Sequence, residues 1–310
     1  MEFLLSCIST KHSMLKKHWS TSEQKKQQIE CPLTVLGSMQ KPKEDQGGLL
    51  ALLDENGRMR AGAELSMPAG IALADDGFMV ASIYDVQKVD THLSTVKETV
   101  SLPAFNMLHS LSRSKRGYLV ASTGLDSILE FTAEGELLWD WWATEHGFEQ
   151  TPTGELRILD KTIDHRGIKY GTLAQTTHVN SVAELSNSTV LATLFHQGMV
   201  IAIDRETGAW QPVLEGLDHP HSVRILNEEY ITVADTARGR GLLVNIKGLQ
   251  GKIEVEVPVD TSWLQDCSYD YHHDRWLLVD GKNSRLVLRT GTAGERHLGQ
   301  IDLNPEWRLY

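Results

Sequence analysis

Three histidines stand at similar places in the chain, each at or just before a short apolar segment. The segments are His109-Ser110-Leu111, Thr177-His178-Val179-Asn180-Ser181-Val182 and His219-Pro220-His221-Ser222-Val223. A turn and a second strand-like segment follow each of them. When the second segments are aligned on Ala81, Ala121, Ala192 and Ala234, one repeat position holds Ala69, His109, Asn180 and His221. His178 lies two residues earlier, and a fifth copy ending in Trp276-Leu277-Leu278-Val279-Asp280 places Asp266 at that position.

Imidazoles at matching repeat positions indicate a chemical site if the fold brings them together. Neutral imidazole binds Fe, Zn or Cu, and three protein ligands with an open position are the usual arrangement for metal catalysis. We therefore expect His109, His178 and His221 to hold a transition metal ion, with Asn180 or Asp266 orienting a ligand. The residues leave an alternative open, in which one histidine is a nucleophile or general base and the others stabilise negative charge.

Further candidates follow from the loops that return to the same end of the repeat. The expected catalytic groups are His221, Asp266, His196 and Arg238. The expected substrate-binding residues are Asn180, Asp126, Trp142, His165, Arg166 and Tyr170.

The elements that must position these side chains repeat at intervals of about 40 to 45 residues, which is typical of a four-stranded propeller blade. The innermost strands of a propeller run parallel around one axis, so residues at one repeat position converge on its channel. We predict an all-β, six-bladed propeller of antiparallel blades, with residues 1–310 forming a single domain. Residues 3–9 and 307–310 are expected to pair and close the ring, which removes open sheet edges.

Two segments interrupt the repeat. Residues 11–46 are basic and polar, and we interpret them as an insertion near the N-terminus. Residues 143–176 are rich in aromatic residues and enter directly before His178, so we expect them to cover one mouth of the channel. Asn56-Gly57 between apolar segments predicts a hairpin with a type I′ turn.

Composition excludes several classes of partner. The net charge of −11 argues against binding to nucleic acid or an anionic membrane, because both require a positive surface. No apolar segment approaches the roughly 18 residues of a membrane span. Three scattered cysteines do not form a disulfide framework, so we expect a cytoplasmic protein that acts on a small molecule.

Residues 128–244 resemble the arylsulfotransferase-like members of the NHL-like six-bladed propellers. The matching motifs are Glu130-Phe131-Thr132-Ala133-Glu134-Gly135-Glu136-Leu137-Leu138-Trp139-Asp140-Trp141, Thr177-His178-Val179-Asn180-Ser181-Val182, Val200-Ile201-Ala202-Ile203-Asp204-Arg205-Glu206-Thr207-Gly208 and Pro220-His221. The resemblance implies transfer of a sulfuryl group from an aryl sulfate, without PAPS, through a sulfated histidine. His221 would be that nucleophile, with His109 and His178 beside the sulfate. Phe195 stands where the family has an arginine, and Arg238 is the candidate to replace that cation.

Three functions remain open from the sequence. The first is a metal-dependent enzyme that acts on a small molecule through the three-histidine site. The second is sulfuryl transfer through His221. The third is a non-catalytic propeller that binds a partner through its faces, because a fold does not by itself define a function.

Overall fold

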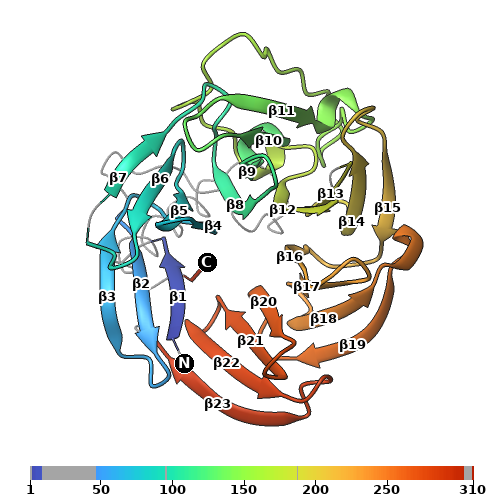
Figure 1. The fold of residues 1–310 in the computed structure, drawn as a ribbon. Coiled ribbons are helices and arrows are strands. Elements are labelled where there is room, and N and C mark those ends of the chain that lie inside the picture. Colours follow the sequence, from blue (N-terminus) through green and yellow to red (C-terminus); the bar gives the residue numbers. More distant parts are fainter. Residues whose placement is uncertain (1, 9–46, 95, 187, 304–308) are drawn as a thin grey trace, which may run out of the picture.

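The computed structural model describes residues 2–8, 47–94, 96–186, 188–303 and 309–310. The predicted insertion at 11–46 therefore lies outside the described residues. Six antiparallel sheets stand around a central axis, as Figure 1 shows. The prediction of an all-β, six-bladed propeller is confirmed.

We number the blades I to VI in chain order. Blade I contains β1 (Glu2–Cys7), β2 (Leu49–Asp54) and β3 (Met59–Glu64), and blade II contains β4 (Ile71–Ala74), β5 (Gly77–Ala81), β6 (Val86–Asp90) and β7 (Val96–Val100). Blade III contains β8 (Leu108–Arg113), β9 (Tyr118–Ser122), β10 (Ser127–Phe131) and β11 (Leu137–Trp142). The 3₁₀ helix η1 (Thr123–Leu125) lies between β9 and β10, and the 3₁₀ helices η2 (Ala143–Glu145) and η3 (Thr172–Ala174) lie in the insertion at 143–176.

The remaining blades have the same strand order. Blade IV contains β12 (Val179–Ser186), β13 (Thr189–Leu194), β14 (Met199–Asp204) and β15 (Trp210–Leu214). Blade V contains β16 (His221–Ile225), β17 (Tyr230–Asp235), β18 (Arg240–Asn245) and β19 (Lys252–Pro258), with the 3₁₀ helix η4 (Lys247–Leu249). Blade VI contains β20 (Leu264–Asp270), β21 (Arg275–Asp280), β22 (Arg285–Thr290) and β23 (Arg296–Asp302).

The C-terminus lies beside β1, the first strand of blade I, on the side that faces the axis (Figure 1). Leu309 forms an antiparallel bridge with Cys7, and the Tyr310 N–H donates to the Ser6 carbonyl at 2.9 Å. The C-terminus thus occupies the place that an innermost strand holds in the other blades. This pairing confirms the predicted closure of the ring.

The amino-acid pattern explains which strands lie inside. All five residues of β9 are buried, because each middle strand packs between two neighbouring blades and is apolar on both sides. The outer strands face solvent, as the exposed first four residues of β7 show.

Serines fasten the innermost strands of neighbouring blades to one another. The Ser110 hydroxyl of β8 accepts from the Val182 N–H of β12 at 3.0 Å, and the Ser181 hydroxyl of β12 accepts from the Val223 N–H of β16 at 2.8 Å. Between blades II and III, Gly70 takes the serine position, where a Cβ would lie 2.3 Å from the Leu111 nitrogen. Each of these contacts fixes the backbone directly after the repeat position, so it also fixes the place of the repeat-position residue in the channel.

The turn between β2 and β3 differs from the predicted type I′ hairpin. That turn needs positive φ at both central residues, whereas only Gly57 has it, with φ 76°. The Asp54 carboxylate instead accepts from the N–H groups of Asn56 and Arg58, at 2.9 and 3.0 Å. A side-chain acceptor thus stabilises a longer turn, and the predicted turn type is wrong.

Candidate functional site

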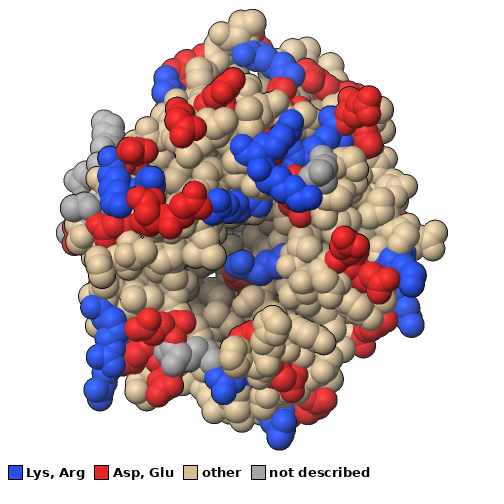
Figure 2. Space-filling view, viewed as in Figure 1, with Lys and Arg blue, Asp and Glu red and all other residues tan. Residues whose placement is uncertain are grey.

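A cavity of about 480 Å³ occupies the channel and is lined by residues of all six blades. Figure 2 shows the hollow near the centre of one face, with charged residues at its edge. His109, Asn180, His221 and Asp266 all line it, although they are far apart in the sequence. The structure thus brings together four residues of the predicted repeat position.

His109 and His221 are held in the same way by equivalent backbone. The Nδ1 atom of each ring lies 3.0 Å from the carbonyl oxygen of the residue two positions earlier, which is Met107 or His219. Met107 and His219 have φ of 49° and 56°, a left-handed conformation that occurs directly before both strands. A carbonyl oxygen can only accept, so Nδ1 carries the proton and Nε2 is the basic nitrogen.

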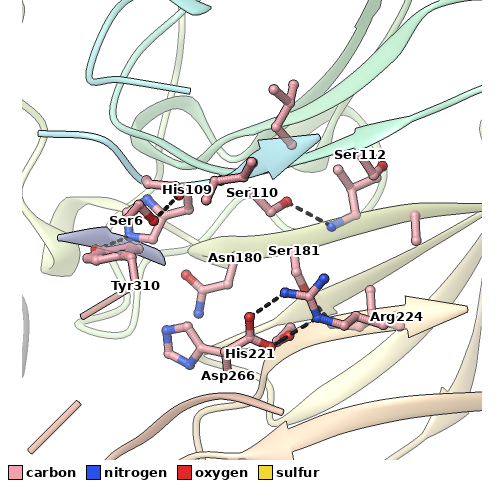
Figure 3. A pocket seen from close by; sticks show the side chains of 18 of the residues that line it. Ser6, His109, Ser110, Ser112, Asn180, Ser181, His221, Arg224, Asp266 and Tyr310 are labelled. Atoms are coloured by element: carbon pink, nitrogen blue, oxygen red, sulfur yellow. Dashed lines mark hydrogen bonds and ion pairs between the residues drawn. The ribbon is translucent and has the colours of Figure 1, made fainter. Parts of the chain in front are cut away.

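His221 has a second anchor on the neighbouring strand of its own blade. The Thr236 hydroxyl lies 2.9 Å from His221 Nδ1, directly after β17. On the opposite side of the cavity, the Tyr310 hydroxyl lies 3.4 Å from His109 Nε2. Figure 3 shows Asn180 between His221 and the pair of His109 and Tyr310.

Asn180 presents a polar atom that no described group satisfies. Its side chain is 3% exposed and lines the cavity, and its amide nitrogen donates to the Pro220 carbonyl at 3.3 Å. Its Oδ1 atom has no hydrogen-bond partner among the described residues. A buried acceptor without a partner costs about 1–3 kcal/mol, so Oδ1 is a natural place for a ligand donor.

The charged groups in the same wall are paired. Arg224 lies against Asp266 (Figure 3), with Nε 3.1 Å from Oδ1. The Ser222 hydroxyl donates to the same carboxylate. The Asp266 carboxylate raises the pKa of Arg224 above its ordinary value. Asp266 is thereby an ion-pair partner at the channel wall.

An aromatic cluster occupies the end of the channel where the innermost strands begin. Phe195 is 4% exposed, and ring centroids surround it at 4.2 Å for His219, 4.7 Å for His178, 5.4 Å for His196 and 5.6 Å for His221. Trp263 completes the cluster at 6.3 Å. The phenyl ring thus occupies the place where the resemblance implies an arginine.

His178 belongs to this cluster rather than to the cavity lining. Its φ is 48°, so it matches Met107 and His219 in backbone position, and its Nδ1 contacts Gln175 Oε1. Its ring centroid is 5.2 Å from that of His109. Burial, together with the other histidines nearby, holds the pKa of His178 well below its usual value, so the ring is neutral.

The three histidines do not fit a shared metal ion. In the part of the chain that the structure describes, no group of three or more His, Cys, Asp or Glu side chains could hold one. Phe195 packs against both His178 and His221, and the Nδ1 atoms of all three predicted ligands already have protein partners. The predicted Fe, Zn or Cu ion therefore gains no support from this geometry and stays a prediction.

Asp126 lies away from the cavity, in the protein interior. It is fully buried, and its carboxylate accepts from the backbone N–H groups of Thr176, Thr177 and His178 at 2.7, 2.9 and 2.6 Å. It also pairs with Arg157 from the insertion. The observed contacts give Asp126 a positioning role, because they fix the end of the insertion and the backbone of His178.

The predicted substrate residues of the insertion contact one another instead of the cavity. His165 is buried, with Nδ1 2.8 Å from the Tyr170 hydroxyl and Nε2 2.8 Å from the Asp160 carbonyl. The Trp142 ring lies 6.3 Å from His165, and Arg166 binds Asp164 at the surface. These contacts give the insertion its own packed interior.

Two predicted catalytic residues also have structural partners. His196 Nε2 lies 3.1 Å from the Thr172 carbonyl, which connects the insertion to the aromatic cluster. Arg238 donates to the Gly216 carbonyl at 2.7 Å and pairs with Asp235 at 3.2 Å. Neither residue lines the cavity, and Arg238 does not replace the missing arginine there.

Several residues of the site were not predicted from the sequence. Tyr310, Arg224 and Gln265 line the cavity, and the serines at 110, 181 and 222 stand directly after the repeat position. The serines had a visible signal, since His109-Ser110, Asn180-Ser181 and His221-Ser222 repeat the same pair of positions. Arg224 and Tyr310 had none, because their neighbours are distant in sequence.

Comparison with known proteins supports the fold alone. No family model matches the chain, and no curated protein matches it. A protein of unknown function from Bacteroides caccae is similar, with a TM-score of 0.61, 14% identity and coverage of 89% of this chain and 95% of that one. A structure described as streptogramin B lyase has a TM-score of 0.51 and 13% identity, and the match covers 78% of this chain and 70% of that one.

A third similar structure is described as a nidogen/laminin complex. Its TM-score is 0.59 at 10% identity, and the match covers 86% of this chain and 94% of that chain. At such identities the likeness shows the fold alone: the chain is a six-bladed β-propeller. No helix among the described residues has the length and apolar character needed to cross a membrane.

Proposed function

We propose that this propeller is an enzyme that transfers a proton to or from a small molecule bound in its channel. One observation carries the proposal: His221, its proton fixed on Nδ1, lines the cavity beside the unsatisfied Asn180 Oδ1. A general base needs a defined tautomer and a positioned substrate. His221 has the defined tautomer, and Asn180 would position the substrate. An enzyme among the similar folds, described as a lyase, is consistent with such chemistry.

The proposed roles follow from the contacts. A hydroxyl or N–H of the substrate donates to Asn180 Oδ1, and His221 Nε2 takes a proton from the substrate. The imidazolium that forms is stabilised by the His219 carbonyl and the Thr236 hydroxyl. The His221 imidazolium then gives this proton to the departing group, which restores the neutral ring. His109 has the same tautomer, so its Nε2 atom, which lies 3.4 Å from the Tyr310 hydroxyl, acts as a hydrogen-bond acceptor.

The test is a search for turnover that depends on His221. Wild type and His221→Gln are incubated with a cytoplasmic metabolite extract, and consumed compounds are identified by mass spectrometry. Loss of a general base is expected to slow the conversion about 10²–10⁴-fold. His272→Gln is the matched control, because His272 lies at the surface in the turn before Trp276 and outside the cavity.

Further measurements on the same protein distinguish the alternatives. A transition metal at His109, His178 and His221 would appear in elemental analysis, and a chelator would remove the activity. A compound retained by the protein and never converted would favour a binding module. Turnover that is equal in His221→Gln and wild type would refute the proposal.

Sulfuryl transfer through His221 is less well supported, because among the described residues that line the cavity no lysine or arginine is left unpaired for a sulfate dianion. Arg224 pairs with Asp266 and Arg238 is held elsewhere. Turnover of an aryl sulfate with a sulfated His221 would establish it.

A cytoplasmic location belongs to the same proposal. Cys7 and Cys267 are free and buried, and burial raises the pKa of Cys7 to about 12. Such thiols act as small apolar side chains.

A further inference from the structure

The strand pairing places Gln265 at the same register position as Asn180 and His221. In blades IV and VI, the residue before Asn180 or Gln265 pairs with the last residue of the second strand. His221 has the same register in blade V, because it pairs with Ala234, the last residue but one of β17. All three residues line the channel cavity. Two amide side chains therefore flank His221, one from each neighbouring blade.

Asn180 offers a hydrogen-bond acceptor. Its amide nitrogen donates to the Pro220 carbonyl at 3.3 Å, which fixes the orientation of the group. Its amide oxygen is buried and has no hydrogen-bond partner among the described residues. In Figure 3 this oxygen points into the space between the His221 and Tyr310 side chains. A ligand that donates a hydrogen bond here removes the cost of the unsatisfied oxygen.

Gln265 offers a hydrogen-bond donor. Its Oε1 atom accepts from Trp263 Nε1 at 2.7 Å, and an indole N–H can only donate, so the amide oxygen faces Trp263. The amide nitrogen therefore lies on the other side of the group. Gln265 is mostly buried and lines the cavity, so this nitrogen is the group that it offers to a ligand. A carbonyl oxygen of the ligand is the matching acceptor.

The ligand group that meets these two residues is uncharged. Neither amide carries a charge. The charged residues that line the cavity have ion-pair partners, namely Asp75 for Arg113, Arg205 for Glu184, and Asp266 for Arg224. An ionic group would enter without an opposite charge, which is costly away from water. A neutral group that combines one N–H donor with one carbonyl acceptor is a carboxamide.

We infer that the molecule bound in the channel carries a neutral carboxamide, whose N–H donates to Asn180 Oδ1 and whose carbonyl oxygen accepts from the Gln265 amide. Gln265 is thereby a substrate-binding residue on the opposite side of His221 from Asn180. This inference names the substrate class of the proposed enzyme and rests on that function only for the conversion. The two hydrogen bonds do not require catalysis, so the ligand class and the enzyme can fail separately.

The probes are N-benzylacetamide and 4-phenyl-2-butanone, titrated into the full chain and followed by ligand-detected NMR. The two molecules have closely similar shapes, but the ketone has a methylene in place of the amide N–H. The ketone is less polar, so a cavity that selects only for apolar character would bind it more tightly. At the inferred site the amide is expected to bind about 10-fold more tightly, because the ketone leaves Asn180 Oδ1 unsatisfied.

Asn180→Ala removes the acceptor and is expected to reduce this preference to less than about twofold. Gln265→Glu keeps an oxygen for Trp263 and puts a carboxylate oxygen in place of the donor, so it is expected to weaken both probes about 10-fold or more. Gln211→Glu is the matched control for the added charge, because Gln211 is exposed on the outer strand β15 and does not line the cavity. It is expected to leave both affinities unchanged.

An amide that binds no more tightly than the ketone overturns the inference, and so does an amide preference that Asn180→Ala leaves unchanged. If Asn180→Ala fails to fold, Gln265→Glu decides, since wild-type affinities in that variant also overturn the inference. An amide preference in a protein whose turnover survives His221→Gln supports the ligand class and refutes the proposed enzyme. Turnover that depends on His221, without an amide preference, refutes the ligand class alone.

Discussion

The chemistry of the channel depends on which nitrogen of each histidine carries its proton. At His109 and His221 a backbone carbonyl two residues earlier decides this, because the residue that carries this carbonyl, Met107 or His219, adopts a left-handed conformation. His178 has that left-handed conformation itself and points into the aromatic cluster. Residues two positions apart thus have different roles: one faces the ligand cavity and the other closes the channel.

His178 makes the stability of the fold depend on pH. Its pKa is lowered in the folded state by burial, whereas an unfolded histidine titrates near pH 6.5. Below about pH 6.5 the unfolded chain binds a proton that the folded chain does not, so stability is lost as the pH falls. The expected slope for this one group is about 1.4 kcal/mol per pH unit.

The check is urea unfolding of wild type and His178→Gln between pH 5 and pH 8. In the variant, the slope of the unfolding free energy against pH is expected to fall by the contribution of one proton. His272→Gln, at an exposed turn, is expected to keep the wild-type slope. Equal slopes in wild type and His178→Gln would show that the ring is protonated inside the fold.

The repeat position was predictable from the sequence, and the partners of its residues were not. Aligned alanines on the second strands brought His109, Asn180, His221 and Asp266 to one cavity, because strand register has a fixed period. The sequence did not show that the Phe195 ring packs between imidazoles or that Arg224 forms an ion pair with Asp266. Both contacts depend on the side-chain rotamers that fill the space between blades. A local sequence pattern does not predict these rotamers.

At the scale of elements, polar contacts within apolar seams attach blade IV to blades III and V. Blades III and IV also share a cluster of charged side chains, in which the buried Glu130 carboxylate accepts from Ser114 and pairs with Arg116 and Arg205. Arg205 also pairs with Glu184 at 2.8 Å. The repeat length predicted these blades, and the ion pairs between them arise only when the blades pack.

Glu130→Ala is expected to destabilise the fold by about 3–5 kcal/mol, because it leaves Arg205 buried with one of its two carboxylates missing. Arg113→Ala, which breaks the exposed pair with Asp75, is expected to cost less than about 1 kcal/mol. Chemical denaturation measures both. A similar cost for the two variants would mean that the seam does not depend on its buried charge.

At the scale of the whole molecule, the ring is closed by a short C-terminal segment. In blade I, Leu309 bridges Cys7 where other blades have a full innermost strand, and Tyr310 reaches His109. One chain end thus completes both the architecture and the wall of the cavity.

Leu309→Ala tests this closure. Leu309 is fully buried in the cluster between blades I and VI, so the substitution is expected to cost about 2–5 kcal/mol. Leu298→Ala is the control, because Leu298 is 50% exposed on an outer strand and is expected to change stability by less than about 0.5 kcal/mol. Unfolding free energies equal to wild type would place the closure of the ring elsewhere.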